Sequence, residues 1–428
     1  MNKQQKQWLA SLAQTATPTM QEALQYLGSE LAWLHELAAT PQDPEWHAEG
    51  NVLIHNDMLL SELYQLLQTQ ATHIQGDRRQ ALILGAMLHD IAKPKQTRVA
   101  EVQGIERIIS PQHEAVGRSY LAFKMLEWGL SFASYWMVLN LVGEHHIPKL
   151  LVAKDKPAAA YYRLARQADM ELLYWLEVAD MRGRICADTE LQLLYLDEFR
   201  TLAQQYGVWQ QPLDMQALLA EHLRSLPRQA QTYVYASALY QLEQGLIYQA
   251  EEALATTYAH RTQHAHLVMV CGVSGSGKST WLQQHYPDYE VVSLDDLREA
   301  LNGDRADQAQ VGQIRQATKE QLKAALRQKR GVVWDATNLR VDFRHAITEL
   351  GRDYHALVTL VLFLLPEAQI EAQNRARSHA IPTAVLAKQL ASFQFPSLEE
   401  AHHFIVVGTG GRVLWQSGID TEVLPCTL

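Results

Sequence analysis

The N-terminal half of the chain carries histidines and aspartates of the types that bind divalent metals. The pair His89–Asp90 closes an apolar, helix-forming run, "LILGAMLHDIAKPKQT" at residues 82–97. Buried polar groups need partners, so a hydrogen-bonded structural histidine is one explanation of the pair and a metal-ligand pair is another. Other candidates complete the ordered set H…HD…H…H…D: His55, His113, His145 with its neighbour His146, and Asp180. Neutral imidazoles and carboxylates from several helices suit a transition metal in a bundle core, and the ordered set favours that explanation.

A second group of residues has the spacing of a phosphate-binding loop. The stretch "GVSGSGKS" at residues 272–279 fits the pattern GxxxxGK[ST], follows an apolar strand and precedes the helical "TWLQQHY". Glycines let backbone N–H groups turn toward phosphate oxygens at a helix start that favours anions. We expect Lys278 to bridge the terminal phosphates and Ser279 to hold Mg²⁺. The predicted nucleotide contacts are Gly272, Ser274, Gly275, Ser276, Gly277, Lys278, Ser279 and Thr280.

The strand that follows this loop ends in residues able to act on a phosphoryl acceptor. Asp295 stands just beyond "YEVVSL", where a carboxylate can take a proton from an attacking hydroxyl. Arg298 lies one helical turn further on and can hold an anionic group of the acceptor. A helix N-cap aspartate beside a solvated arginine is the structural alternative.

Two further strand ends add candidates. "VVWDATN" places Asp335 and Asn338 at a third strand end, and both are expected to contribute to nucleotide binding. "NRARSHAIP" follows the fourth strand and places Arg375 and Arg377 where they can close over the transferring phosphoryl group. Paired arginines on a solvated helix are common, so their position after the strand is the stronger argument.

The patterning predicts a multidomain protein. Apolar residues recur at three- and four-residue spacing from about residue 5 to 248, which predicts an all-α helical bundle. From residue 266 short apolar strands alternate with helical stretches, as in an α/β domain with a parallel sheet. We expect a hydrolase-type helical domain at 1–195, a helical connecting region at 196–262 and a P-loop domain at 263–428.

Composition restricts location and partners. The formal net charge is −10, so any nucleic acid must bind through a local basic groove. Three scattered cysteines make a disulfide framework or a cysteine-built zinc site improbable. The N-terminal stretch has no apolar core of a secretory signal, and the longest apolar run, at 356–365, is too short to span a bilayer. We therefore expect a cytoplasmic protein without membrane partners.

Four motifs in the C-terminal part resemble the kinase domain of the polynucleotide kinase family, over about residues 267–395. In order, they are the P-loop, "SLDDLR", "WDATNL" and "NRARSHAIP". The resemblance implies that Asp295 is the general base on a 5′-hydroxyl and that Arg298 grips the acceptor's 3′-phosphate. It also implies that Arg377 is a lid arginine. The other lid arginine of that family usually precedes the asparagine of this motif; here that residue is Gln373, and Arg375 is the substitute.

The histidine–aspartate set resembles the HD phosphohydrolase superfamily, and "LHDIAK" with "ADMRGR" is especially similar to the HD domain appended to bacterial tRNA nucleotidyltransferases. The resemblance implies that four residues bind one metal: His55, His89, Asp90 and Asp180. It implies that His113 and His145 bind a second metal or the phosphate, with His146 equally well placed. Lys93, one turn beyond the pair, is a candidate phosphate contact.

The two domains together resemble the bifunctional HD–polynucleotide kinase family of bacterial RNA end-healing enzymes. This implies phosphorylation of 5′-hydroxyl RNA or DNA ends with ATP or another NTP and Mg²⁺. It also implies removal of a 2′,3′-cyclic, 2′- or 3′-phosphate with Mn²⁺, Ni²⁺ or Co²⁺, before a separate ligase seals the ends. Two alternatives stay open: an HD nucleotidase or phosphodiesterase fused to a small-molecule kinase, and an ATP-binding domain that regulates the HD hydrolase.

Overall fold

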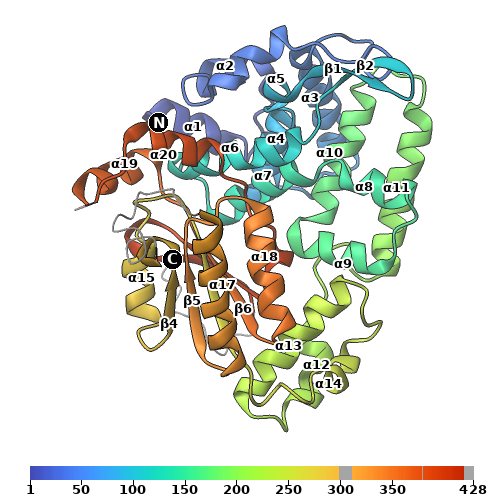
Figure 1. The fold of residues 1–428 in the computed structure, drawn as a ribbon. Helices are drawn as coiled ribbons and strands as arrows, with labels where there is room; N and C mark the ends of the chain where they lie inside the picture. The colour runs from blue at the N-terminus through green and yellow to red at the C-terminus, as the bar shows by residue number, and fades with distance from the viewer. Residues whose placement is uncertain (298–310, 378, 419–428) are drawn as a thin grey trace. The chain divides into compact units, whose positions relative to one another are not determined.

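The computed structural model describes residues 1–297, 311–377 and 379–418. Contacts divide the chain into two compact units, Met1–Leu213 and Asp214–Leu428, coloured from blue to green and from yellow to red in Figure 1. The boundary between the units lies inside the predicted connecting region, and the division at residues 195 and 262 stays a prediction. No helix among the described residues is both long and apolar enough to cross a membrane.

The first unit is helical apart from one hairpin. Its helices are α1 (Lys3–Ser11), α2 (Met20–Leu27), η1 (Ala32–Ala39), α3 (Val52–Thr69), α4 (Gly76–Leu88), α5 (Lys93–Gln96), α6 (His113–Lys124), η2 (Met125–Glu127), α7 (Phe132–Glu144), α8 (Ile147–Ala153), α9 (Ala158–Gln167), α10 (Met170–Arg182) and α11 (Thr189–Gln205). The hairpin pairs β1 (Arg98–Val102) with β2 (Ile105–Ile109). The predicted all-α bundle is thus confirmed.

Helix α4 is the centre of the first unit. Every residue from Arg79 to Leu88 is buried, as expected for a helix that is apolar on nearly all sides. It packs against α3, α7 and α10. A Cβ at Gly85 would lie 2.8 Å from Leu141 Cδ1, so glycine allows the close approach of α4 and α7. The side chain of Asn51 caps α3 by accepting from Ile54 N at 3.1 Å. This packing brings several helix ends together in the core.

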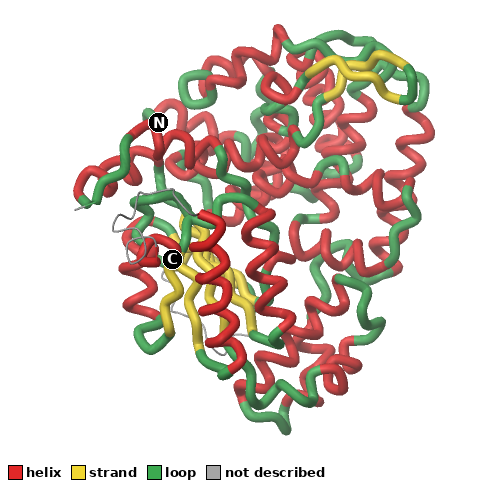
Figure 2. Tube along the Cα trace, viewed as in Figure 1, coloured by secondary structure: helices red, strands yellow, loops and turns green. Residues whose placement is uncertain are grey.

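The second unit combines helices with a six-stranded sheet, which Figure 2 shows in yellow. Its helices are α12 (Met215–Leu223), α13 (Arg228–Glu243), η3 (Ala250–Glu252), α14 (Ala253–Thr256), α15 (Lys278–His285), α17 (Val311–Arg327), α18 (Val341–Asp353), α19 (Glu367–Ala376), α20 (Thr383–Ala391), η4 (Leu398–Glu400) and η5 (Thr409–Gly411). Its strands are β3 (His266–Cys271), β4 (Glu290–Ser293), β5 (Gly331–Asp335), β6 (Leu357–Phe363), β7 (His403–Val407) and β8 (Val413–Gln416).

The sheet is parallel except at one edge. Its strand order is β4-β5-β3-β6-β7-β8, and only β8 runs antiparallel to its neighbour. All seven residues of β6 are buried, as is typical of a central parallel strand. Figure 1 shows α17 and α18 over the same face of the sheet. The predicted α/β architecture is confirmed, and its topology places the ends of β3, β4, β5 and β6 at one edge.

A buried ion pair fastens the loop after β5 to the rest of the sheet domain. Arg344 of α18 is fully buried, and its Nε and Nη2 donate to the two carboxylate oxygens of Glu400 at 2.6 and 2.9 Å. Its Nη1 donates to the carbonyls of Asn338 and Leu339, at 3.1 Å each. One guanidinium therefore joins α18, η4 and the loop after β5, whose Thr337 carbonyl accepts from the N–H of Gly272.

We predict that Arg344→Met destabilises the second unit by about 3–5 kcal/mol, because it leaves the buried Glu400 carboxylate without its counter-ion. Urea denaturation of the full chain, followed by circular dichroism, measures the change. As a control, Asp342→Ala, which breaks an exposed pair with Arg340, should leave the unfolding midpoint unchanged. A loss below about 1 kcal/mol for Arg344→Met contradicts the anchoring role.

Candidate metal centre and nucleotide site

The predicted metal ligands of the first unit converge from five helices, α3, α4, α6, α7 and α10. His89 and Asp90 directly follow α4, His113 begins α6, and His145 directly follows α7. All four of these side chains are buried. His55 of α3 and Asp180 of α10 are also fully buried, and His55 Nε2 lies 2.9 Å from Asp180 Oδ1. The structure therefore brings together residues that lie up to 125 positions apart in the sequence.

Three of the imidazoles are held by the same kind of hydrogen bond to the backbone. Nδ1 of each ring donates to the carbonyl of the residue three positions earlier, at 2.9 Å for His89, 2.7 Å for His113 and 2.9 Å for His145. For His89 and His145 that carbonyl belongs to the last turn of a helix, where it lacks an intrahelical partner. Because Nδ1 carries the proton of this hydrogen bond, Nε2 is the nitrogen of each ring that can bind a metal ion.

These free nitrogens face acceptors. His113 Nε2 lies 3.0 Å from Asp90 Oδ1, and His89 Nε2 lies 3.2 Å from Asp90 Oδ2. Neither nitrogen, nor the Nε2 of His145, has a hydrogen-bond partner among the described residues. A lone pair and a carboxylate oxygen this close in a dry core repel each other unless a proton on the ring or a metal ion lies between them. The donor set therefore fits a bound divalent metal.

Two groups of ligand atoms from the predicted set are each close enough together to hold an ion. The atoms of one group, His55, His89 and Asp90, all lie within 4.8 Å of one another, and so do those of His113, His145 and His146. His145 is fully buried and its pKa is held well below the usual value by burial and by neighbouring imidazoles, which keeps it neutral for binding. The side chain of His146 is 37% exposed, and its Nδ1 lies 2.7 Å from Glu114 Oε1. Both remain candidate ligands, with His145 deeper in the centre.

Cationic side chains surround the carboxylates. Lys93 is buried, and its Nζ lies 2.7 Å from Asp90 Oδ2 while donating to Gln42 Oε1 at 2.7 Å. Arg184, one turn after Asp180, donates to both oxygens of that carboxylate. Burial alone would raise the pKa of Asp180, but Arg184 and His55 beside it keep that pKa well below its usual range. The centre is thus able to hold an anionic phosphate.

Several residues of this centre escaped the sequence analysis. Lys149 Nζ lies 2.7 Å from Glu177 Oε2, and both side chains stand beside Asp180. The one-turn spacing of Asp180 and Arg184 was a usable signal. His47 and Glu49 lie in a loop without periodicity, so no pattern could connect them with His55 before the fold was known.

In the second unit the phosphate-binding loop joins β3 to α15. Gly275 and Gly277 have φ angles of +85° and +86°, which only glycine adopts readily. A Cβ at Gly275 would lie 3.1 Å from the carbonyl oxygen of Ile370. Lys278, the first residue of α15, donates from Nζ to Val273 O at 2.9 Å. The loop therefore has the backbone and the lysine that a triphosphate requires.

The remaining predicted loop contacts are spread around this turn. Gly272 N donates to Thr337 O at 3.0 Å, and Ser274 N donates to Gln389 Oε1 at 2.8 Å. Ser276 is buried, whereas Thr280 is exposed. The backbone thus ties the loop to the end of β5 and to α20.

Acidic residues from two neighbouring strands lie beside the loop. Ser279 Oγ donates to Asp335 Oδ2 at 3.2 Å, which places a hydroxyl and a carboxylate together as Mg²⁺ requires. Asp295 is exposed and follows β4; its charge acts on both Lys278 and Asp335. Burial lowers the pKa of Lys278 to about 8 even though Asp335 opposes this shift. Burial raises the pKa of Asp335.

The other predicted residues of this unit differ in their surroundings. Asn338 is buried with φ +50°, and its side-chain amide donates to Val270 O at 2.6 Å while accepting from Trp334 Nε1 at 3.2 Å. The first of these hydrogen bonds joins the loop after β5 to the backbone of β3. The predicted contact of Asn338 with the nucleotide stays a prediction. Arg375 and Arg377 are exposed, and the charge of Arg377 acts on Lys278. Arg298 lies outside the described residues.

Comparison with known families agrees with the two units. An HD domain matches residues 61–172 and an AAA domain matches residues 267–396. The chain therefore joins an HD phosphohydrolase domain to a P-loop kinase-like domain. His55 and Asp180 lie just outside the HD match, although the structure places them in the same centre as His89. HD domains bind divalent metals, and P-loop kinases use ATP and Mg²⁺.

No match was found among curated proteins. Among solved structures, a gluconokinase from Sinorhizobium meliloti 1021 is similar at 21% sequence identity, over 35% of this chain and 85% of that chain, with a TM-score of 0.26.

We predict that His89→Ala and Asp90→Ala each weaken the binding of Mn²⁺ to the full chain by more than about 100-fold. Loss of a residue that only supports a ligand weakens metal binding by roughly 10–100-fold, and loss of a ligand should cost more. Each variant removes an inward-facing ligand atom. Isothermal titration calorimetry measures the affinity, and His73→Ala, an exposed histidine paired with Glu171, is the control. Unchanged affinity in both variants would show that the metal assignment is wrong.

We predict that the affinity for ATP falls as the pH rises above about 8, by up to about tenfold per pH unit. The pKa of Lys278 is lowered to about 8 in the free protein, and bound phosphates favour its charged form, so binding takes up a proton above that pH. Fluorescence titration with a labelled ATP analogue from pH 7 to 9.5 measures this. Lys278→Arg, which stays charged, should show a flat profile. A flat wild-type profile contradicts the prediction.

Proposed function

We propose that the chain heals the ends of broken RNA. The HD domain removes a 2′,3′-cyclic, 2′- or 3′-phosphate, and the P-loop domain phosphorylates a 5′-hydroxyl with ATP or another NTP. The observation that carries the hydrolase half is the set of buried imidazoles whose free Nε2 atoms face the carboxylate of Asp90. The products, a 3′-hydroxyl and a 5′-phosphate, are the ends that a separate ligase joins.

The hydrolase half needs a metal and a positive environment. A divalent metal held by His55, His89, Asp90 and Asp180, with His113 and His145 or His146 nearby, supplies activation of water when bound. Lys93 brings an ammonium group to within 2.7 Å of Asp90 and neutralises charge on an incoming phosphate. Burial of these groups excludes bulk water and strengthens each of the electrostatic contacts.

The kinase half is arranged around Lys278. The backbone of the glycine loop holds the donor phosphates, while Ser279 and Asp335 hold Mg²⁺. Asp295 takes the proton of the attacking 5′-hydroxyl, and its position at the adjacent strand end supports this role. Arg298 holds the acceptor's 3′-phosphate, and Arg375 and Arg377 close over the donor.

A second candidate function is supported by the acidic character of the chain. A formal net charge of −10 disfavours a long nucleic-acid contact and favours a nucleotide or another small metabolite as the acceptor. In that case the HD domain acts as a nucleotidase or phosphodiesterase, and the same residues carry the chemistry.

One RNA substrate tests the proposal. A synthetic RNA with a 5′-hydroxyl and a 2′,3′-cyclic phosphate is incubated with the full chain, ATP, Mg²⁺ and Mn²⁺, with Ni²⁺ or Co²⁺ in parallel, and mass spectrometry reads both ends. We expect phosphate gained at the 5′ end and lost at the 3′ end. Asp295→Asn should slow only the first reaction, by roughly 10²–10⁴-fold, with ATP binding retained. His89→Ala should stop only the second.

The controls separate the alternatives. If the wild-type chain leaves both RNA ends unchanged while it still binds ATP and metal, RNA is not the substrate, and the small-molecule function takes its place. If Asp295→Asn retains full kinase activity, Asp295 is not the general base.

A further inference from the structure

His55 differs from the other imidazoles of the centre in how its Nδ1 is held. His89, His113 and His145 each donate from Nδ1 to a backbone carbonyl. His55 lies inside α3, where the carbonyls of the preceding turn serve the helix itself; Asn51 O, for example, accepts from His55 N at 3.1 Å. The Nδ1 of His55 therefore needs an acceptor from another part of the chain.

The carboxylate of Glu49 is the group that lies beside this nitrogen. Its Oε1 lies 3.0 Å from His55 Nδ1 and accepts from His47 Nδ1 at 2.8 Å. Its other oxygen, Oε2, accepts from the backbone N–H of Ile185 at 2.9 Å. The side chain is 1% exposed although it belongs to a surface loop. A buried carboxylate that accepts two hydrogen bonds and has the Nδ1 of His55 3.0 Å away is a specific arrangement, because an unpaired carboxylate would be costly.

We infer that Glu49 is a positioning residue of the metal centre, which orients His55 so that its Nε2 faces the metal beside Asp180. The inference rests on the proposed metal site. A carboxylate on one nitrogen of an imidazole fixes the tautomer and makes the opposite nitrogen a better ligand. His55 Nε2 points to Asp180 Oδ1 at 2.9 Å, so the ring is held from both sides.

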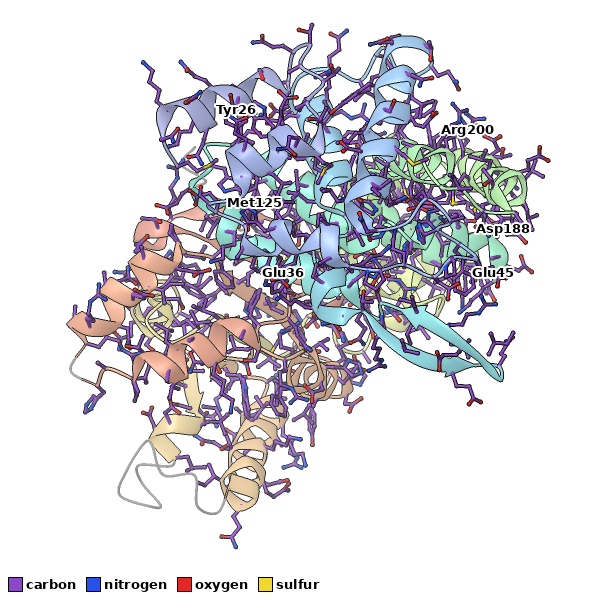
Figure 3. The ribbon with its side chains drawn as sticks, turned by 90° about the horizontal axis from the view of Figure 1, so that it is seen from above. Tyr26, Glu36, Glu45, Met125, Asp188 and Arg200 are labelled. Atoms are coloured by element: carbon purple, nitrogen blue, oxygen red, sulfur yellow. The ribbon has the colours of Figure 1, made fainter. Side chains whose placement is uncertain are left out.

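The loop that carries Glu49 is fastened around the centre at several points. Ala48 N donates to Ile185 O at 3.0 Å, which joins the loop to the segment just after Asp180. Figure 3 labels Glu45 in this loop and Asp188 beyond that segment on the same side of the unit. Gln42 accepts from Lys93, and Asp43 accepts from the N–H of Ile108 in the hairpin at 3.0 Å. Glu49 thus connects His55, the first metal ligand in the sequence, with Ile185, which follows the last ligand, Asp180.

His47 completes the arrangement without taking the ligand's place. Its ring packs edge-on against His55, with centroids 4.8 Å apart. Its Nδ1 donates to Oε1 of Glu49, whereas the N–H of Ile185 donates to Oε2, so each carboxylate oxygen has its own donor. A metal held directly by His47, Glu49 and His55 is the competing arrangement, because their ligand atoms also lie within 4.8 Å of one another.

The test compares Glu49→Gln with Glu45→Gln, a control in the same loop whose carboxylate is exposed and pairs with Arg107. Calorimetry on the full chains gives the number of bound Mn²⁺ ions and their affinity. The visible spectrum of bound Co²⁺ reports ligand geometry, and thermal unfolding without metal reports the fold. We expect Glu49→Gln to weaken binding about 10–100-fold and to change the Co²⁺ spectrum, with the metal count unchanged. Glu45→Gln should match wild type.

Glu49→Asp provides a second test if Glu49→Gln does not fold. It keeps the charge but withdraws the carboxylate from His55, so a smaller loss of affinity is expected. Wild-type affinity in the folded variant overturns the inference, even where the thermal midpoint falls. Loss of one whole metal equivalent overturns it too, because Glu49 is then a ligand. Failure of the wild-type chain to bind metal instead refutes the proposed centre.

Discussion

The metal centre depends on one hydrogen bond repeated three times, from an imidazole Nδ1 to a backbone carbonyl three residues earlier. Two of these carbonyls lie in the last turns of α4 and α7, where a helix leaves acceptors unused. A histidine placed immediately after a helix satisfies such a carbonyl and turns its second nitrogen toward the core. The same local rule therefore completes the helix and prepares the ligand, and helix packing only has to bring the ends together.

The second unit obtains its site from topology rather than from local capping. In a parallel sheet the carboxyl ends of neighbouring strands lie side by side. Residues that follow β3, β4 and β5 therefore meet although they are far apart in the sequence. Asp335 reaches Ser279 in this way, across 56 residues. The buried guanidinium of Arg344 joins the adjoining loop to Glu400 through hydrogen bonds to the carbonyls of Asn338 and Leu339.

The sequence predicted what depends on local pattern. The P-loop, the alternation of strands and helices, and the His–Asp pair at a helix end were all legible, and the predicted fold is confirmed. Side chains that act through tertiary contacts were not: Glu49 and Lys149 became visible only when the fold placed them beside His55 and Asp180. Asn338 also donates from its side-chain amide to the backbone of β3, and the nucleotide contact suggested by its place at a strand end stays a prediction.

X-ray absorption at the cobalt edge, on the full chain loaded with Co²⁺, tests the central claim most directly. The account predicts nitrogen and oxygen ligands with outer-shell scattering from at least two imidazole rings, and weaker imidazole scattering in His89→Ala. A spectrum with oxygen ligands alone, unchanged by that substitution, would contradict the claim that the inward-facing histidines form a metal centre.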